Sequence, residues 1–101
     1  MFNLEIEKLE VKAEAASALL SAMANPRRLL ILCNLLGREM NVTELGERVG
    51  LAQSALSQHL SKLRGWELVA TRREGQQVYY RIASDDVRRI LETLYAIYCR
   101  D

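Results

Sequence analysis

The apolar positions of this chain repeat every three or four residues over most of its length, which is the spacing of helices that bury one face. An alanine-rich stretch over roughly residues 4–24 predicts a first helix. Asn25 followed by Pro26 is a typical cap and first position of a second helix, which continues to about Gly37. The apolar stripe of the second helix is formed by Leu29, Leu32, Cys33 and Leu36.

Two further helices are predicted in the middle of the chain, separated by a glycine. Thr43 is a candidate cap for a short third helix over residues 44–49, although Gly46 stands where a capping box needs an acid. Gly50 permits a sharp turn, and a fourth helix then runs over about residues 53–64. Two helices joined in this way predict a helix-turn-helix. The expected inward-facing residues are Leu45, Val49, Leu51, Leu56, Leu60 and Leu63.

The pattern changes after the fourth helix, where β-branched and aromatic residues gather in two short runs. Residues 68–72 and 78–82 predict a hairpin whose tip, residues 73–77, contains Gly75. Ser84 then caps a last helix with Asp85 and Asp86 in its first turn, where the helix dipole favours negative charge. This order predicts a mainly helical winged helix-turn-helix with a β-hairpin wing, and the length allows a single domain over residues 1–101.

Charge is balanced in total but not along the chain. The formal net charge is +1, yet residues 54–82 carry five Lys and Arg against two Glu, whereas residues 1–15 carry two Lys against four Glu. Basic charge therefore gathers around the fourth helix and the hairpin, which favours a nucleic-acid partner for that region.

Several classes of protein do not fit the sequence. The start of the chain is acidic, unlike a secretory signal, and uncharged stretches such as residues 15–26 are shorter than the roughly 20 residues of a membrane span. We therefore expect a protein of the reducing cytoplasm. The sequence has a single histidine, and it contains neither a glycine-rich loop for phosphate binding nor a nucleophile elbow. No set of residues suited to catalysis can be identified, so an enzyme is not expected.

The fourth helix and the hairpin supply the candidate contacts to DNA. The leucines of the helix place a polar face on its opposite side, and Gln and Ser can hydrogen-bond base edges. Arginines on a hairpin suit phosphates or a minor groove. Polar helix faces and charged hairpins also occur as surfaces that only contact solvent, but the adjacency of the two in this chain favours DNA binding. The predicted DNA-binding residues are Ser54, Ser57, Gln58, Ser61, Lys62, Arg64, Arg72, Arg73, Gln76 and Gln77.

Three ring side chains lie near this surface. His59 falls beside the leucine stripe of the fourth helix and is expected to be a partly buried packing residue. Tyr79 and Tyr80 alternate along a strand, so one of them is expected in the core and the other on the outside.

Four motifs carry a family resemblance: Asn25-Pro-Arg-Arg-Leu-Leu-Ile-Leu, Thr43-Glu-Leu, Ser54-Ala-Leu-Ser-Gln-His-Leu-Ser-Lys-Leu-Arg and Val78-Tyr-Tyr-Arg. They closely resemble the ArsR/SmtB winged-helix repressors, over roughly residues 15–99. The resemblance implies a homodimer joined through the first and last helices, with the fourth helix reading the major grooves of a palindromic operator. One passage departs from the family, which usually has Ala-Gly-Leu-Val after the recognition helix. Here it is Gly65-Trp-Glu-Leu-Val, which leaves the turn and the role of Trp66 open.

A bound metal or other cofactor is not expected. Metal-sensing members of the family use a Cys-x-Cys near the third helix or Asp/His pairs on the last helix. Here the third helix begins Asn41-Val-Thr-Glu-Leu and the last helix has no histidine. Oxygen ligands alone would make a poor zinc site, and helix capping explains Asp85 and Asp86 better.

The two cysteines, Cys33 and Cys99, are the candidate sensors. Taken alone, two cysteines are at least as often inert small apolar residues. The chain also resembles a dithiol branch of the family, which includes the biofilm-growth and sulfide-responsive repressors and the haemolysin regulator. That branch has one cysteine in the second helix and one near the end of the last. There, persulfides or oxidants link the pair through a disulfide or polysulfide and loosen DNA binding, which implies redox sensing of reactive sulfur species at Cys33 and Cys99.

Two alternatives stay open. The nodulation regulator is also very similar in the recognition helix but lacks the cysteine pair, so this chain could be a winged-helix regulator without a thiol switch. It could also be a protein-interaction winged helix that has lost DNA binding, in which case any DNA binding would be weak and show little salt dependence.

Overall fold

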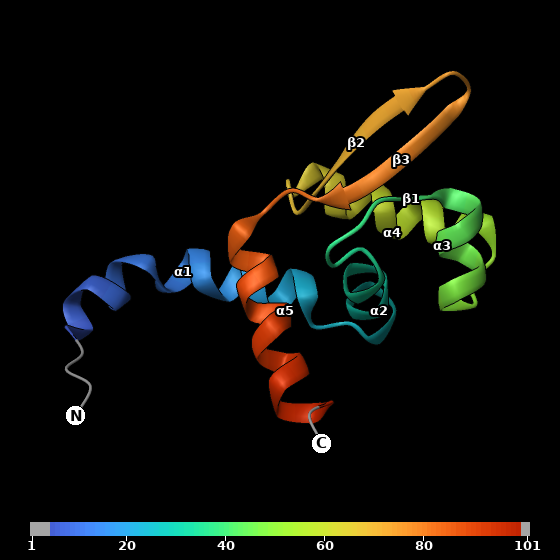
Figure 1. Ribbon diagram of the computed structural model, residues 1–101. Helices are drawn as coiled ribbons and strands as arrows, with labels where there is room; N and C mark the ends of the chain where they lie inside the picture. The colour runs from blue at the N-terminus through green and yellow to red at the C-terminus, as the bar shows by residue number, and fades with distance from the viewer. Residues whose placement is uncertain (1–4, 100–101) are drawn as a thin grey trace.

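The computed structural model describes residues 5–99 and confirms the predicted order of four helices, a hairpin and a last helix (Figure 1). A short strand that the sequence pattern did not predict pairs with the hairpin, so the sheet has the order β1-β3-β2. The elements are α1 (Ile6–Met23), α2 (Pro26–Asn34), β1 (Met40–Asn41), α3 (Val42–Val49), α4 (Gln53–Gly65), β2 (Val69–Glu74), β3 (Gln77–Ile82) and α5 (Asp85–Tyr98). The predicted start of the first helix at residue 4 lies outside the described residues.

The core lies where α2, α3, α4 and α5 meet the base of the sheet. The three leucines predicted for the inner stripe of the fourth helix, Leu56, Leu60 and Leu63, are all buried. Burial of a leucine contributes about 1.5–3 kcal/mol, so this stripe fixes which face of α4 turns outward. Other buried core residues are Met23, Ile31, Leu32, Leu35, Met40, Leu45, Val49, Leu68, Val69, Val87 and Leu91.

Helix α2 is tied at its start to the ends of two other helices. The Asn25 side chain accepts hydrogen bonds from the backbone N–H groups of Arg27 and Arg28, as its cap role predicts. Arg28 donates from Nε to the Ala22 carbonyl (2.6 Å) and so caps the end of α1, while Arg27 donates from Nη1 to the Val49 carbonyl (3.3 Å) at the end of α3. The two arginines satisfy carbonyls that have no partner within their own helices.

The predicted cap of the third helix is wrong by two residues. Asn41, not Thr43, accepts from the backbone N–H of Glu44 (2.9 Å), and the Glu44 carboxylate accepts from the Asn41 N–H (3.1 Å). This reciprocal pair is a complete capping box. Because strand β1 ends at Asn41, the chain changes from strand to helix at a single residue.

The hairpin turn is also tighter than predicted. Strands β2 and β3 pair from Val69 with Ile82 to Glu74 with Gln77, which leaves a two-residue turn instead of a five-residue tip. Gly75, with φ +63°, is the first turn residue, a position where hairpin turns of two residues favour glycine.

The passage after α4 that departs from the family pattern forms a Schellman turn. The Leu68 N–H donates to the Leu63 carbonyl and the Glu67 N–H to the Arg64 carbonyl, both at 2.9 Å. Glu67 occupies the left-handed position of this motif with φ +63°, where glycine is the usual residue. The turn geometry is therefore kept, but a side chain is held in a conformation that its Cβ disfavours.

Glycine at position 67 is therefore expected to stabilise the protein. The Glu67→Gly substitution removes the Cβ clash of the left-handed conformation and should raise the free energy of unfolding by about 1 kcal/mol. Denaturant unfolding at fixed protein concentration measures this change. The control is Glu67→Ala, which removes the carboxylate but keeps the Cβ. A gain from alanine equal to that from glycine would locate the cost in the charge and not in the backbone.

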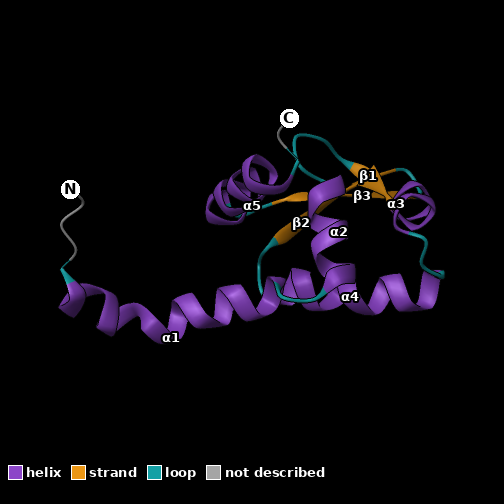
Figure 2. Cartoon of the chain, turned by 90° about the horizontal axis from the view of Figure 1, so that it is seen from below, coloured by secondary structure: helices purple, strands orange, loops and turns teal. Residues whose placement is uncertain are grey.

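Helix α1 extends away from the rest of the protomer, as Figures 1 and 2 show from two directions. Its 18 residues span about 27 Å, and its buried residues are Ala22 and Met23 at its C-terminal end. No helix within residues 5–99 is long and apolar enough to cross a membrane.

Candidate nucleic-acid interface

The turn between α3 and α4 holds the two helices in close contact. The Leu51 N–H donates to the Gly46 carbonyl (3.2 Å), and Gly50 has φ +68°. A Cβ on Gly46 would lie 3.4 Å from the Leu51 carbonyl oxygen and 3.5 Å from Leu56 Cδ2. A Cβ would just fit at these distances, but a side chain that extends beyond Cβ would meet the Leu51 carbonyl and Leu56, which supports the predicted role of a small residue at the helix crossing.

The outer face of α4 is polar and open to solvent. The inner leucines point into the core, and the polar side chains on the opposite side form no side-chain hydrogen bond or ion pair with any other residue of the described range. Lys62 and Arg64 lie in the last turn of the helix and add positive charge to this face. All six predicted contact residues of the helix are exposed: Ser54, Ser57, Gln58, Ser61, Lys62 and Arg64.

The two predicted arginines of the wing lie on opposite faces of the hairpin. Cross-strand pairing places Arg73 on the face of Val78 and Tyr80, and Tyr80 packs against the core. Arg72 pairs with Tyr79 on the outer face, so the expectation of one inward and one outward tyrosine is confirmed. Both arginines, together with Gln76 and Gln77, are exposed.

Arg72 and Gln77 already have partners within the protomer. Arg72 donates from Nε to Glu39 Oε1 (2.7 Å), lies 3.4 Å from a Glu74 oxygen, and covers the ring of Tyr79 with 4.6 Å between Cζ and the ring centroid. These acceptors raise the pKa of the Arg72 guanidinium. Gln77 accepts from the Asn41 side-chain amide (3.3 Å). Arg73 forms no ion pair with any described residue.

A group of cations that the sequence pattern did not bring together lies where α4 meets α2. His59 is partly buried, as predicted, and its pKa is lowered by loss of water and by the nearby charges of Arg28, Lys62 and Arg27. A lowered pKa keeps the His59 ring neutral at pH 7. The motif Asn25-Pro-Arg-Arg supplies two of the cations of this cluster. The sequence alone does not show that these arginines of α2 lie near His59 of α4.

Trp66 is the C-cap residue of α4. It is 47% exposed, and the Arg28 guanidinium lies over its ring, 5.4 Å from the ring centroid. The indole therefore packs against the arginine that caps α1, which gives Trp66 a contact between α4 and the α1–α2 corner.

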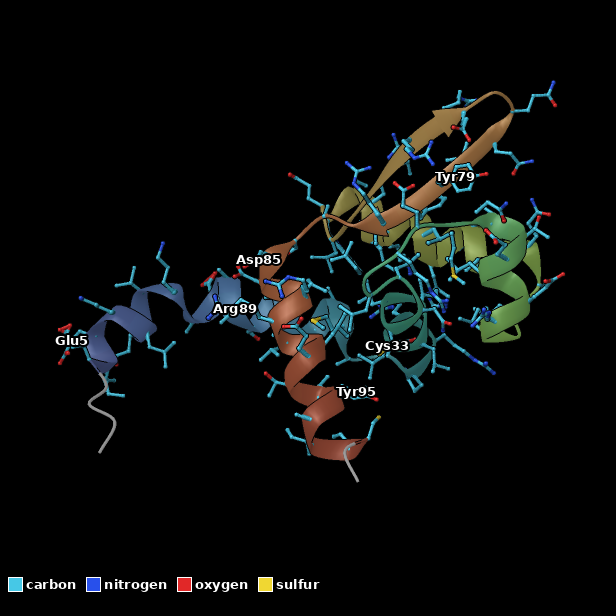
Figure 3. All side chains as sticks on the ribbon, viewed as in Figure 1. Glu5, Cys33, Tyr79, Asp85, Arg89 and Tyr95 are labelled. Carbon is cyan, nitrogen blue, oxygen red and sulfur yellow. The ribbon has the colours of Figure 1, made fainter. Side chains whose placement is uncertain are left out.

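Both cysteines are exposed in the single protomer. This corrects the expectation that Cys33 belongs to the apolar stripe of α2, because the buried residues of that helix are Ile31 and Leu32. The pKa of the Cys33 thiol is raised by partial loss of water and by the charge of the Cys99 thiolate. Figure 3 shows Cys33 on α2 on the same side of the molecule as Tyr95 in the last turn of α5.

Metal ligands do not gather in the part of the chain that the structure describes. No group of three or more His, Cys, Asp and Glu side chains within residues 5–99 is placed to hold a metal ion. Asp85 and Asp86 lie in the first turn of α5, where each is close to an arginine one turn along the helix: Asp85 to Arg88, and Asp86 to Arg89 at 3.9 Å.

Comparison with known proteins places this arrangement in a family. Residues 25–71, which run from the α2 cap through α4 into strand β2, match the model of bacterial regulatory proteins of the arsR family. Nodulation protein NolR of Rhizobium meliloti is 58% identical over 88% of this chain and 73% of its own length. The chain belongs to the ArsR family. This ArsR-family protein is therefore a transcriptional regulator and not an enzyme.

Two further relatives extend the match to nearly the whole chain. Transcriptional activator HlyU of Vibrio cholerae is 47% identical over 96% of this ArsR-family chain and 90% of its own length. The crystal structure of the transcriptional repressor BigR from Xylella fastidiosa superposes with a TM-score of 0.90 at 34% identity, covering 97% of this chain and all of that one. The winged helix-turn-helix fold is thereby confirmed.

Proposed function

We propose that this protein is a repressor that binds a palindromic operator as a homodimer, with α4 in the major groove and the wing on the flanking backbone. The observation that carries the proposal is the exposed polar face of α4 beside a hairpin whose Arg73 has no ion-pair partner within residues 5–99. The whole chain then acts as one domain for DNA binding and dimerisation, and the cytoplasm is its place of action.

The side chains of α4 suit base edges more than phosphates. Gln58 can bond adenine with both its oxygen and its nitrogen, and the short hydroxyls of Ser54, Ser57 and Ser61 let the helix approach closely. Lys62 and Arg64, together with Arg73 and Gln76 on the wing, would hold phosphates and set the register of the helix on the duplex.

Two substitutions test this division of roles. Gln58→Ala should weaken binding to a selected operator by about 1–3 kcal/mol and leave binding to mixed-sequence duplex unchanged. Arg73→Gln should weaken binding to both duplexes and lower the slope of log K against log salt by about 0.9 for each phosphate that the variant no longer neutralises. The operator is a duplex selected by the protein from a randomised pool. Weak binding without salt dependence would instead favour a protein-interaction winged helix.

The dimer contact is proposed to lie on α1 and α5. In α1, the exposed residues Ile6, Leu9, Ala13, Ala16 and Leu20 follow one another at intervals of three and four. This is the a and d spacing of helices that pair along an apolar seam, and the alanines let two backbones approach closely. Helix α5 adds exposed apolar side chains near its end: Tyr95 (63%), Ile97 (63%) and Tyr98 (80%). A second copy of the chain would cover both surfaces.

The effector is proposed to be a reactive sulfur species or an oxidant that links Cys33 to Cys99. A direct disulfide needs the two Cα atoms within about 7 Å, and inserted sulfur relaxes that limit. The charge interaction between the two sulfurs supports such a link, and so does the existence of a structure of HlyU named for its reduced state. Because the link would join α2 to the dimerising helix α5, it would change the distance between the two recognition helices.

A regulator without a thiol switch is the second candidate. The observation that favours it is that the chain is 58% identical to nodulation protein NolR but 47% identical to HlyU. In that case Cys33 and Cys99 are packing residues of the assembled dimer, and oxidation leaves operator binding unchanged.

A further inference from the structure

The outer face of the sheet is crossed by the Arg72 side chain. Arg72 lies on β2, at one edge of the sheet, and Glu39 directly precedes β1 at the other edge. To reach Glu39 Oε1 at 2.7 Å, the guanidinium passes over Tyr79 on the central strand β3, with 4.6 Å between Cζ and the ring centroid. Cross-strand pairing joins Arg72 to Tyr79 and Tyr79 to Asn41, so these three residues lie in one row across the sheet (Tyr79 is labelled in Figure 3).

Few backbone bonds hold the wing to the helices on this side. Strand β1 has two residues, which pair with Tyr80 and Tyr79 of β3, and β2 pairs with β3 alone. Two side-chain links add to this short pairing: Arg72 to Glu39, and Gln77 to Asn41. Asn41 is also the N-cap of α3, so the outer face of the wing is joined to the start of the first helix of the helix-turn-helix.

We propose that Arg72 is a positioning residue which, through Glu39 and Tyr79, fixes the angle of the wing to the recognition helix, and that Arg73 is the wing arginine that contacts DNA. This rests on the proposed function, because it concerns how the wing engages the duplex. Arg73 lies on the opposite face of the hairpin, the face of Tyr80 toward the helices, and has no ion-pair partner among residues 5–99. A wing that is already held at one angle loses no further conformational freedom when it contacts the DNA backbone.

Removal of the Glu39 carboxylate is expected to change DNA affinity in the direction opposite to simple electrostatics. Removal of a carboxylate near DNA should strengthen binding by simple electrostatics, because phosphates repel it. If Glu39 instead holds the wing through Arg72, its removal frees the hairpin, which must be ordered again on binding. The cost of ordering one or two side chains of the freed hairpin on binding would weaken DNA binding by roughly three- to ten-fold.

The experiment measures operator affinity of the full-length dimer as a function of salt, on a selected duplex of about 30 base pairs, long enough for two half-sites one turn apart. The variants are Glu39→Ala, Arg72→Lys and Arg73→Gln, with Glu47→Ala as the matched control on the exposed face of α3. We expect Glu39→Ala and Arg72→Lys each to weaken binding three- to ten-fold with an unchanged salt slope, and to speed amide exchange in β2 and β3 alone. Glu47→Ala should bind as tightly as the wild type or more tightly.

Two results would overturn the proposal. If Glu39→Ala binds DNA more tightly while Arg72→Lys keeps full affinity, then Arg72 acts as a charge toward phosphate, since lysine replaces arginine in that role but not in a planar contact. If Arg73→Gln leaves both affinity and salt slope unchanged, the wing makes no backbone contact there, and the assignment of Arg73 fails. Failure of the proposed function itself would look different, because no variant, the wild type included, would bind the selected duplex with steep salt dependence.

Discussion

Glutamate in place of Leu9 is expected to separate the two protomers and to abolish operator binding at low protein concentration. Leu9 is 51% exposed and belongs to the apolar seam of α1, near the start of the helix, on the part that projects from the protomer. Each dimer would lose two buried leucines of about 2 kcal/mol each, which raises the dimer dissociation constant about a thousand-fold. A monomer offers one recognition helix, so it also loses the gain from binding two half-sites together.

The same helix supplies the control for this prediction. Val11 is more exposed than Leu9, at 81%, but lies on the side of α1 opposite the seam. Val11→Glu should therefore leave the dimer and its operator affinity intact. Sedimentation velocity and operator titration of the two variants measure both quantities. If Leu9→Glu remained dimeric with full affinity, the seam would not be the contact between protomers.

Treatment with an organic persulfide is expected to weaken operator binding about 100-fold or more, toward non-specific affinity. The two recognition helices must lie about 34 Å apart to enter successive major grooves, so a small shift of α5 against α2 takes both half-sites out of register. In the reaction, each thiol gains one sulfur as the persulfide RSSH becomes RSH. Two cysteine persulfides then condense to a trisulfide and release H₂S. Because burial and the Cys99 thiolate raise the pKa of Cys33, the reaction should quicken as pH rises.

Serine variants separate a switch from mere modification. Cys33→Ser and Cys99→Ser should each keep reduced-state operator affinity and stay bound after persulfide, with intact mass recorded on the same samples. If a double serine variant still releases DNA on treatment, the cysteines are not the sensor. If the wild type acquires the sulfur link and stays bound, the second candidate, a regulator without a thiol switch, is the correct one.

The sequence predicted those parts of the fold that depend on local pattern. The leucine stripe of α4, the Asn25-Pro26 start of α2 and the Ser84 cap of α5 each arise from residues close together in the chain. The cap of α3 is equally local, since Asn41-x-x-Glu44 is a complete capping box within four residues. Thr43 is not the cap because it lies inside the first turn of the helix, where the backbone is already helical.

The contacts that the sequence did not predict join segments far apart in the chain. Arg72 and Glu39 are 33 positions apart and meet only because β3 inserts between β1 and β2. Strand β1 is too short for any alternation of polar and apolar residues to reveal it. The candidate DNA face could be predicted because helical periodicity determines it. The engagement of Arg72 within the protein could not, because it depends on sheet order.

Trp66 gives this protein a built-in optical reporter. It is the sole tryptophan of the chain, and it lies at the end of α4 beneath a guanidinium that is itself bonded to the last carbonyls of α1. Indole emission responds to a cation held against the ring. A movement of α1 relative to α4 is therefore expected to alter the fluorescence of the unlabelled protein, which would allow the proposed DNA binding and release to be followed in real time without a dye.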